Sequence, residues 1–338
     1  MSRRRTKSRQ LLRRLLWGVA ALPALGVAGL AIVLGLAHLE IRRRDPPLPS
    51  DAEVLALADA AAAPSAVAWQ LTASQAVPRS QVLDPALDPE PGAPYAMSHP
   101  SFALAWPDGR LLLVDLGMER EAALAFGRPL EWLGAEPAEF HGGAASALGP
   151  AAARVGAVLF SHLHTDHVEG VLALCAARGG AALAVPQTAA QAELVNHTTR
   201  PGHRLLERAG CPAPGRLPVT ALAPVEGFGG VGVVDAAGHT PGSQVVLAVL
   251  HGQGGERRLA FTGDVANHVA GIRLDVGKPP AYRALVVPEW DERLGRVRCW
   301  LRHLEQELGF ELVVAHDRAQ LESLGLPTFE SLRDSAAG

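Results

Sequence analysis

The stretch Ser161-His162-Leu163-His164-Thr165-Asp166-His167 is the most informative part of this 338-residue sequence, because it places three histidines and an aspartate within six positions. It directly follows the apolar run from Val155 to Phe160, which predicts a buried strand. In an extended segment, side chains two positions apart point to the same side. His162 and His164 can therefore bind one ion together.

Asp166 and His167 lie where the chain leaves this strand, and a helix is predicted from about Asp166 to Arg178. Because the chain changes direction there, both side chains can face a second ion nearby. Imidazole nitrogens and carboxylate oxygens suit Zn²⁺, and Mn²⁺ or Fe²⁺ also accept them. A chance histidine-rich loop is the alternative, and the density of ligand types makes it a poor one.

In this pattern the chain resembles the metallo-β-lactamase superfamily, whose signature is His-x-His-x-Asp-His after an apolar strand. The resemblance covers roughly residues 64–320 and includes four further motifs in the expected order. They are Val114-Asp115-Leu116-Gly117, Gly238-His239-Thr240-Pro241-Gly242-Ser243, Phe261-Thr262-Gly263-Asp264 and Val313-Val314-Ala315-His316-Asp317. Five ordered motifs make the resemblance specific.

The resemblance implies an α/β fold, the four-layer αββα metallo-β-lactamase sandwich, with the site at one edge of the paired sheets. It also implies two metal ions. The first would take His162, His164 and His239, the second would take Asp166, His167 and His316, and Asp264 would lie between them. Asp115 is expected to support the site without being a ligand.

Two divalent ions about 3.5–4 Å apart can share a water and lower its pKa towards 7. We therefore predict a dinuclear metal-dependent hydrolase that uses a metal-bridging hydroxide, with Zn²⁺ as the preferred metal. Asp166 and Asp264 are the predicted catalytic residues. The predicted partner is a small-molecule substrate, an ester, lactone or similar compound.

Charge and motif details narrow the substrate class. The first 14 residues hold seven basic residues, and the rest of the chain has 24 basic against 34 acidic residues, a net charge of −10. This acidic balance disfavours nucleic acid as a partner. The absence of a basic cluster, with Lys278 the only lysine beyond the tail, disfavours the glutathione thioester hydrolases. The bridging Asp264 disfavours the β-lactam-cleaving members.

The sequence leans towards the lactonase-like branch, with one departure. Such lactonases carry a tyrosine shortly after the bridging aspartate, and here that place holds Ala266-Asn267-His268. His268 and Tyr282 are the candidates for facing the substrate. The other histidines are expected to have no role in the site: His38, His99, His141, His197, His203, His251 and His303.

Two alternatives to the hydrolase remain open from the residues. One is an oxidoreductase of the same fold, similar to persulfide dioxygenases, with a single iron at His162, His164 and His239. The other is a membrane-tethered metal-binding module, whose ligands would be saturated and closed to solvent.

The N-terminus predicts a membrane anchor. Leu15 to Ala37 is a run of 23 uncharged residues, which as a helix reaches about 34 Å and can cross a bilayer. We predict a basic cytoplasmic tail at 1–14, a transmembrane helix or signal anchor at 15–38, a stalk and short helix at 39–63, and the hydrolase domain at 64–338. The basic tail places this domain on the extracytoplasmic, periplasmic side. Export after signal cleavage is the alternative.

The remaining elements are predicted from apolar periodicity. We expect a helix at Asp51–Ala63 with Asp51 as its N-cap, a hairpin from Phe102 to Gly117 and a helix at Asp291–Glu307. Further strands are expected at 66–76, 181–185, 232–234, 244–250, 258–261, 284–287 and 311–314. The three cysteines are expected to be small buried apolar residues, with one disulfide and a free thiol as the alternative.

Overall fold

The computed structural model describes residues 23–60, 62–252 and 254–334. The basic tail predicted at 1–14 and the start of the predicted span lie outside the described residues. Two sheets form the centre of the fold, with strand orders β4-β1-β2-β3-β5-β6-β7 and β12-β11-β10-β9-β8.

The first sheet has an antiparallel and a parallel half. Its strands are β1 (Ala66–Ala76), β2 (Ala96–Ala105), β3 (Leu111–Val114), β4 (Glu139–Phe140), β5 (Val155–Leu159), β6 (Leu183–Gln187) and β7 (Pro212–Arg216). Strands β1, β2 and β3 pair antiparallel, as the predicted hairpin requires, and β3, β5, β6 and β7 pair parallel.

The second sheet is antiparallel except at one edge. Its strands are β8 (Ala223–Pro224), β9 (Val231–Asp235), β10 (Gln244–Gly252), β11 (Gly255–Gly263) and β12 (Phe310–Val314). Only β11 and β12 pair parallel. As a result β9, β11 and β12 run in the same direction, and their carboxyl ends lie at the same edge.

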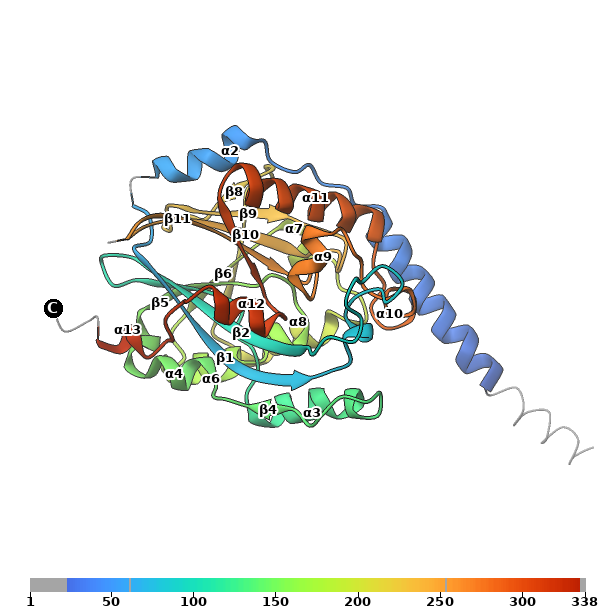
Figure 1. The fold of residues 1–338 in the computed structure, drawn as a ribbon. Helices are drawn as coiled ribbons and strands as arrows, with labels where there is room; N and C mark the ends of the chain where they lie inside the picture. Colours follow the sequence, from blue (N-terminus) through green and yellow to red (C-terminus); the bar gives the residue numbers. More distant parts are fainter. Residues whose placement is uncertain (1–22, 61, 253, 335–338) are drawn as a thin grey trace, which may run out of the picture.

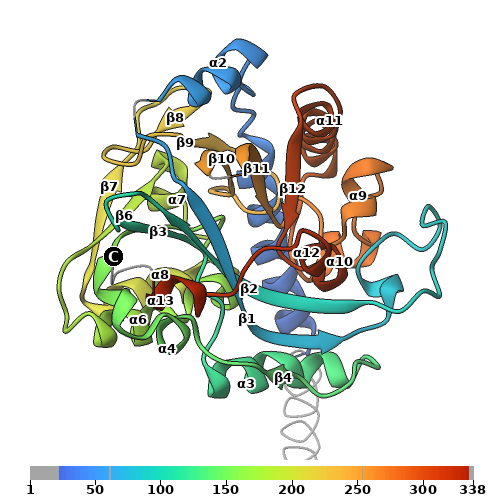
Figure 2. The same ribbon diagram turned by 60° about the vertical axis from the view of Figure 1, so that its left-hand side comes forward.

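Helices cover the outer faces of both sheets (Figures 1 and 2). The first sheet carries α3 (Arg120–Glu131), α4 (Ala144–Leu148), α5 (Thr165–Val168), α6 (Val171–Ala177) and α8 (Arg200–Ala209), and α7 (Ala189–Glu193) follows β6. The second carries α2 (Asp51–Leu55), α9 (Val269–Arg273) and α11 (Asp291–Glu307). Three further short helices are α10 (Pro280–Leu285), α12 (Arg318–Ser323) and α13 (Ser331–Asp334). The predicted four-layer αββα architecture is confirmed.

Successive side chains of the central strands point to opposite faces of the sheet and so contribute to two different hydrophobic cores. In β3, Leu112 and Val114 face the second sheet, whereas Leu111 and Leu113 pack under the helices. The layer between the sheets includes Phe102 and Phe261, whose ring centroids lie 5.1 Å apart. Because both faces of these strands are buried, their sequences are continuous apolar runs rather than alternating ones.

Several local predictions need correction. The segment predicted as a strand at 284–287 instead forms the end of α10 and the turn after it; this helix has Pro280 in its first turn, where proline is favoured. The helix predicted at 166–178 is two helices that meet at Gly170, where a Cβ atom would lie 2.5 Å from the Leu116 carbonyl oxygen. The N-cap of α2 is Ser50, which forms a capping box with Glu53.

For the cysteines, the structure shows the alternative of one disulfide and a free thiol, and not three small buried apolar residues. Cys175 in α6 and Cys211 before β7 form a disulfide with a Cα–Cα distance of 5.8 Å, and Cys299 is free and exposed. The bridge spans 36 residues, and chain-entropy arguments give such a bridge about 4 kcal/mol of stabilisation. It joins a covering helix to the edge of the first sheet.

Within the described part of the chain, one helix, Pro23–Arg42, is long and apolar enough to cross a membrane, with a mean hydropathy of 2.0. It projects from the domain (Figure 1). Leu34, Ala37 and Ile41 are buried and recur at the spacing of one helix face, so this face packs on the domain. The other large apolar side chains between Leu25 and Leu39 are exposed. The helix is a candidate for a membrane anchor or a signal sequence.

Candidate metal centre

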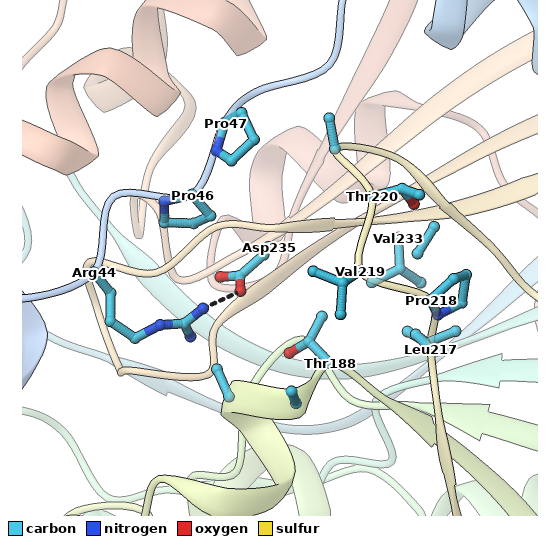
Figure 3. A pocket seen from close by; sticks show the side chains of 14 residues that line it. Arg44, Pro46, Pro47, Thr188, Leu217, Pro218, Val219, Thr220, Val233 and Asp235 are labelled. Carbon is cyan, nitrogen blue, oxygen red and sulfur yellow. Dashed lines mark hydrogen bonds and ion pairs between the residues drawn. The ribbon is translucent and has the colours of Figure 1, made fainter.

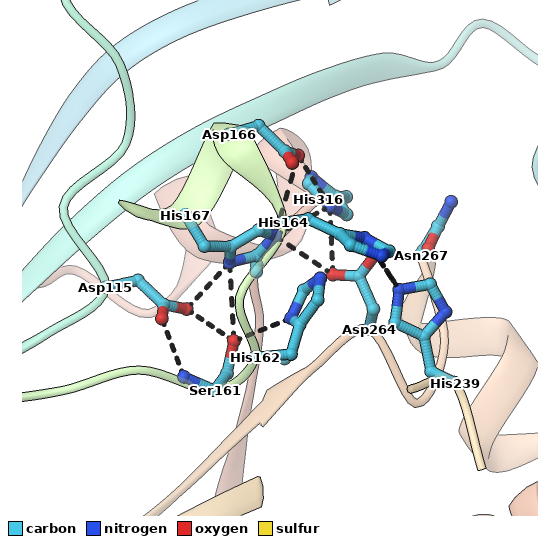
Figure 4. A network of polar contacts seen from close by, with 12 residues as sticks. Asp115, Ser161, His162, His164, Asp166, His167, His239, Asp264, Asn267 and His316 are labelled. Carbon is cyan, nitrogen blue, oxygen red and sulfur yellow. Dashed lines mark hydrogen bonds and ion pairs between the residues drawn. The ribbon is translucent and has the colours of Figure 1, made fainter. Parts of the chain in front are cut away.

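The candidate site lies where strands of both sheets end. Asp115 follows β3 and His162 follows β5 in the first sheet. Asp264 directly follows β11 in the second sheet, and His316 follows β12 by two residues. The carboxyl ends of these strands meet between the layers, so four stretches that are distant in sequence share one site (Figure 4).

Two groups of potential ligands lie side by side and share Asp264. One contains His162, His164, His239 and Asp264, and the other contains His167, His316 and Asp264; within each group the ligand atoms lie within 4.8 Å of one another. Asp264 Oδ2 lies 3.3 Å from His239 Nε2. Its other oxygen, Oδ1, lies 3.3 Å from His167 Nε2 and 2.9 Å from His316 Nε2. The carboxylate thus faces one group with each oxygen.

Asp166 lies beside the second group. Its Oδ2 is 3.5 Å from His167 Nε2 and 3.6 Å from His316 Nε2. All seven residues predicted as ligands are therefore brought together.

The donor atoms fit divalent cations. His162 Nε2 and His164 Nε2 are buried and have no hydrogen-bond partner among the described residues, and leaving such atoms unpaired costs about 1–3 kcal/mol each. His167 Nε2 and His316 Nε2 lie only 3.3 Å apart. A cation between such nitrogens and carboxylate oxygens would satisfy all of them, and this donor set suits Zn²⁺.

The buried histidines of the site differ in protonation, because burial favours the neutral imidazole and nearby carboxylates favour the charged one. Burial lowers the pKa of His162 and His164 well below the ordinary value, so both imidazoles are neutral, as metal ligands must be. Burial also acts to lower the pKa of His167, but the charges of Asp115 and Asp166 outweigh it and raise this pKa well above the usual value. The carboxylates thus favour a proton on His167, and a metal cation bound there would balance the same negative charge.

Asp115 supports the second group by contacting His167, as expected. Its Oδ2 lies 2.8 Å from His167 Nδ1 and accepts a 2.7 Å hydrogen bond from Ser161 Oγ, while Oδ1 accepts one from the Ser161 amide. A carboxylate on Nδ1 leaves Nε2 free to bind a metal. Asp115 has a φ of 54°, in the left-handed region that few non-glycine residues adopt.

Two supporting residues were not found from the sequence. Glu289 Oε1 lies 2.5 Å from His239 Nδ1, the same arrangement that Asp115 makes with His167. Lys278 Nζ donates a 2.8 Å hydrogen bond to this Glu289 oxygen and lies 3.7 Å from Asp264 Oδ2. Both side chains are buried. The only sequence signal was that Lys278 is the single lysine outside the tail.

His99 corrects an expectation, because it was assigned no role. This buried histidine of β2 places Nδ1 at 3.2 Å from Asp166 Oδ2, and it forms a third potential metal-binding group with Asp166 and His316. No motif surrounds it, so only the pairing of β2 in the sheet brings it to the site.

The two candidates for facing the substrate lie at different places. His268 caps α9 by accepting a hydrogen bond from the Ala270 amide, and its Nε2 lies 3.3 Å from Arg79 Nη1. The ring of Tyr282 lies 5.5 Å from Lys278 Nζ. Burial, together with the charges of nearby carboxylates that include Asp264, raises the pKa of Tyr282 well above its usual value. Tyr282 is therefore a neutral phenol.

A cleft of about 230 Å³ lies elsewhere, between the stalk and the β7–β8 connection (Figure 3). On its wall, Arg44 forms a 2.6 Å ion pair with Asp235 and donates a 2.7 Å hydrogen bond to the Pro241 carbonyl. None of the potential metal ligands lines this cleft. It is separate from the candidate site.

Comparisons with known proteins agree on the fold. The model of the family described as the metallo-beta-lactamase superfamily matches residues 97–298. An N-acyl homoserine lactone hydrolase, solved with the product N-hexanoyl-L-homoserine bound at the catalytic metal center, is 16% identical with a TM-score of 0.56, over 77% of this chain and 96% of that chain.

Two other solved structures are similar at the same identity of 16%. A B. thuringiensis AiiA mutant with N-decanoyl-L-homoserine bound at the active site has a TM-score of 0.55, over 77% of this chain and 96% of that chain. A quorum-quenching N-acyl homoserine lactone lactonase has a TM-score of 0.52, over 77% and 95%. Likeness at this identity shows the fold. The search of curated proteins gave no match.

Proposed function

Because this chain belongs to the metallo-beta-lactamase superfamily of metal-dependent hydrolases, we propose that it is a dinuclear enzyme that hydrolyses a small ester or lactone. The observation that carries this proposal is Asp264, whose two oxygens face two separate groups of histidines. A carboxylate in this position suits a bridge between two cations. A single-iron oxidoreductase would need only His162, His164 and His239, and would leave the second group without a purpose.

The chain's own residues have distinct tasks in this proposal. His162, His164 and His239 would hold one cation, and Asp166, His167 and His316 the other, with Asp264 between them. Cations bound there would supply an activated water as the nucleophile and would polarise the scissile carbonyl. Asp115 orients His167, and Glu289 orients His239, in each case by contacting Nδ1 of the imidazole ring. Tyr282, as a neutral phenol, would donate a hydrogen bond to a substrate oxygen in this proposal.

We choose an ester or lactone because the fold is shared with N-acyl homoserine lactone hydrolases. The test is a hydrolysis screen of the purified full chain against homoserine lactones, aryl esters, thioesters, phosphodiesters and a β-lactam, with a metal count by mass spectrometry. We expect about two metals per chain and loss of activity with a chelator. A fully active protein without bound metal would refute the proposal.

We also propose that the N-terminal helix anchors the hydrolase domain on the extracytoplasmic side of a membrane. The Cys175–Cys211 disulfide supports this side, since disulfides persist in oxidising compartments. Retention of the helix is supported by its contacts, because Ala37 and Ile41 are buried and His38 Nε2 lies 3.2 Å from the Ala284 carbonyl. Protease accessibility in spheroplasts, with N-terminal sequencing of the mature chain, tests both points.

A further inference from the structure

Exposed apolar side chains concentrate on three segments of the domain. Among the described residues beyond the N-terminal helix, seven large apolar side chains are more than half exposed, and six of them lie on these segments. The six are Leu87, Trp132, Leu133, Leu274, Leu285 and Val286; the seventh, Val219, lies between β7 and β8. Such clustering of exposed apolar surface indicates a contact with a partner or a membrane.

The three segments, 77–95, 130–135 and 270–286, pack together, and we call them the apolar rim. Val82 and Leu83 from the first segment share one hydrophobic cluster with Leu130 from the second and Val276 from the third. Gln81 Nε2 donates a 2.7 Å hydrogen bond to the Leu133 carbonyl. The Asp84 amide donates one of 2.9 Å to the Gly277 carbonyl. The rim is therefore one continuous structure.

The apolar rim borders the candidate metal centre directly. The Tyr95 hydroxyl oxygen lies 2.5 Å from the main-chain carbonyl oxygen of His316, one of the predicted ligands, and 2.8 Å from that of Asn267, and its single proton is donated to one of the two. From the third segment, Lys278 Nζ lies 3.7 Å from Asp264 Oδ2, and Tyr282 belongs to α10. The first and third segments of the apolar rim therefore both contact the candidate metal centre.

The N-terminal helix leaves the domain at the same end. His38 contacts the Ala284 carbonyl of α10, and Figure 1 shows α10 against this helix. The uncharged run of the sequence ends at Ala37. The contact with α10 is thus made by the first residue after the run, at the level where a spanning helix would leave the hydrocarbon. Leu285 and Val286, at the end of α10, lie next to this level.

We propose that the apolar rim rests on the bilayer that holds the N-terminal helix, and that the site takes substrates whose acyl chain is dissolved in that bilayer. The first half of this inference rests on the proposed membrane anchor, and the second half rests on the proposed hydrolase function. Trp132, which is 87% exposed, suits the membrane–water interface, where tryptophan is favoured. The substrate is then an amphiphile, an ester or lactone with a long acyl chain and a polar head that reaches the metal centre.

Membrane contact is tested with the full chain in vesicles of phosphatidylcholine and phosphatidylglycerol that contain a lipid with a shallow doxyl quencher. Comparison of the wild type with Trp132→Phe isolates the fluorescence of Trp132 from that of the other tryptophans. We expect the doxyl lipid to quench the Trp132 contribution strongly. A Trp132 contribution that the doxyl lipid leaves unquenched would overturn the proposal.

The substrate class is tested with N-butanoyl and N-dodecanoyl homoserine lactone in the same vesicles. We expect the wild type to prefer the dodecanoyl compound. Leu285→Ser with Val286→Ser should reduce this preference about tenfold, since two exposed apolar side chains that would contact the acyl chain are lost. Val219→Ser is the matched control, and its preference should equal that of the wild type. An unchanged preference in the double variant would overturn the proposal. If the wild type hydrolyses neither compound, the lactonase function fails, and the quenching result still decides membrane contact.

Discussion

Glu289→Gln should lower the affinity of the first ligand group for a divalent cation by about 10- to 100-fold, the usual cost of losing a carboxylate behind a metal-binding histidine. This corresponds to about 1.4–2.7 kcal/mol. The structural reason is the 2.5 Å contact between Glu289 Oε1 and His239 Nδ1. A glutamine amide can still approach His239, but it no longer holds the imidazole with a negative charge.

The same substitution has a second cost, because Lys278 is only 3% exposed. Its ion pair with Glu289 is 2.8 Å long, and its next carboxylate neighbour, Asp264 Oδ2, is 3.7 Å away. Removing one partner of a buried pair costs about 3–5 kcal/mol of folding stability. Combining Glu289→Gln with Lys278→Met removes both charges, so it should recover most of this stability while the cation affinity stays low.

The assay separates the two effects. Competition with a chromophoric chelator gives the affinity for Zn²⁺, and thermal unfolding of the metal-free full chain in detergent gives the stability. Lys278→Met alone is the matched control for the loss of the lysine. If Glu289→Gln bound Zn²⁺ as tightly as the wild type, Glu289 would not orient His239 and this account of the site would be wrong.

Three further predictions follow from the site and the core. Asp264→Asn should lower the metal count from about two towards one and reduce hydrolysis by more than tenfold, because it weakens the carboxylate shared by both groups; a full count by mass spectrometry would contradict the bridge. Replacing Cys175 and Cys211 with serine should lower the free energy of unfolding by about 4 kcal/mol, measured by denaturant titration against the Cys299→Ser control. Leu159→Ala, in the layer between the sheets, should cost about 2–5 kcal/mol in the same titration without changing the metal count.

The residues that could be predicted are those whose role is encoded locally. His162, His164, Asp166 and His167 lie in one short stretch, and the other three ligands lie in motifs at the ends of apolar strands. Asp115 was found for the same reason. Glu289 lies 50 residues from His239 in a stretch without a motif. Only the packing of the segment that follows α10 brings it to the site, and a single sequence contains no signal for that.

The local errors have similar causes. A short apolar run such as 284–287 fits a strand or a helix equally well by periodicity, and Pro280, which favours a helix start, lies outside the run. The pairing of Cys175 with Cys211 depends on α6 lying against the edge of the first sheet, which spacing alone does not reveal. His99 was missed because no motif surrounds it. It reaches the site only because of the register in which β2 pairs within the sheet.

The distribution of the ligands between the sheets links metal binding to folding. His162, His164 and His167 come from the first sheet, whereas Asp264 and His316 come from the second. Neither sheet alone can hold a cation with this set, so the site exists only when the sandwich closes. Without a cation, closure brings His167 Nε2 and His316 Nε2 to 3.3 Å and leaves two buried imidazole nitrogens unpaired. A bound cation removes both costs, and because it binds only the closed sandwich, its binding free energy adds to the stability of the fold.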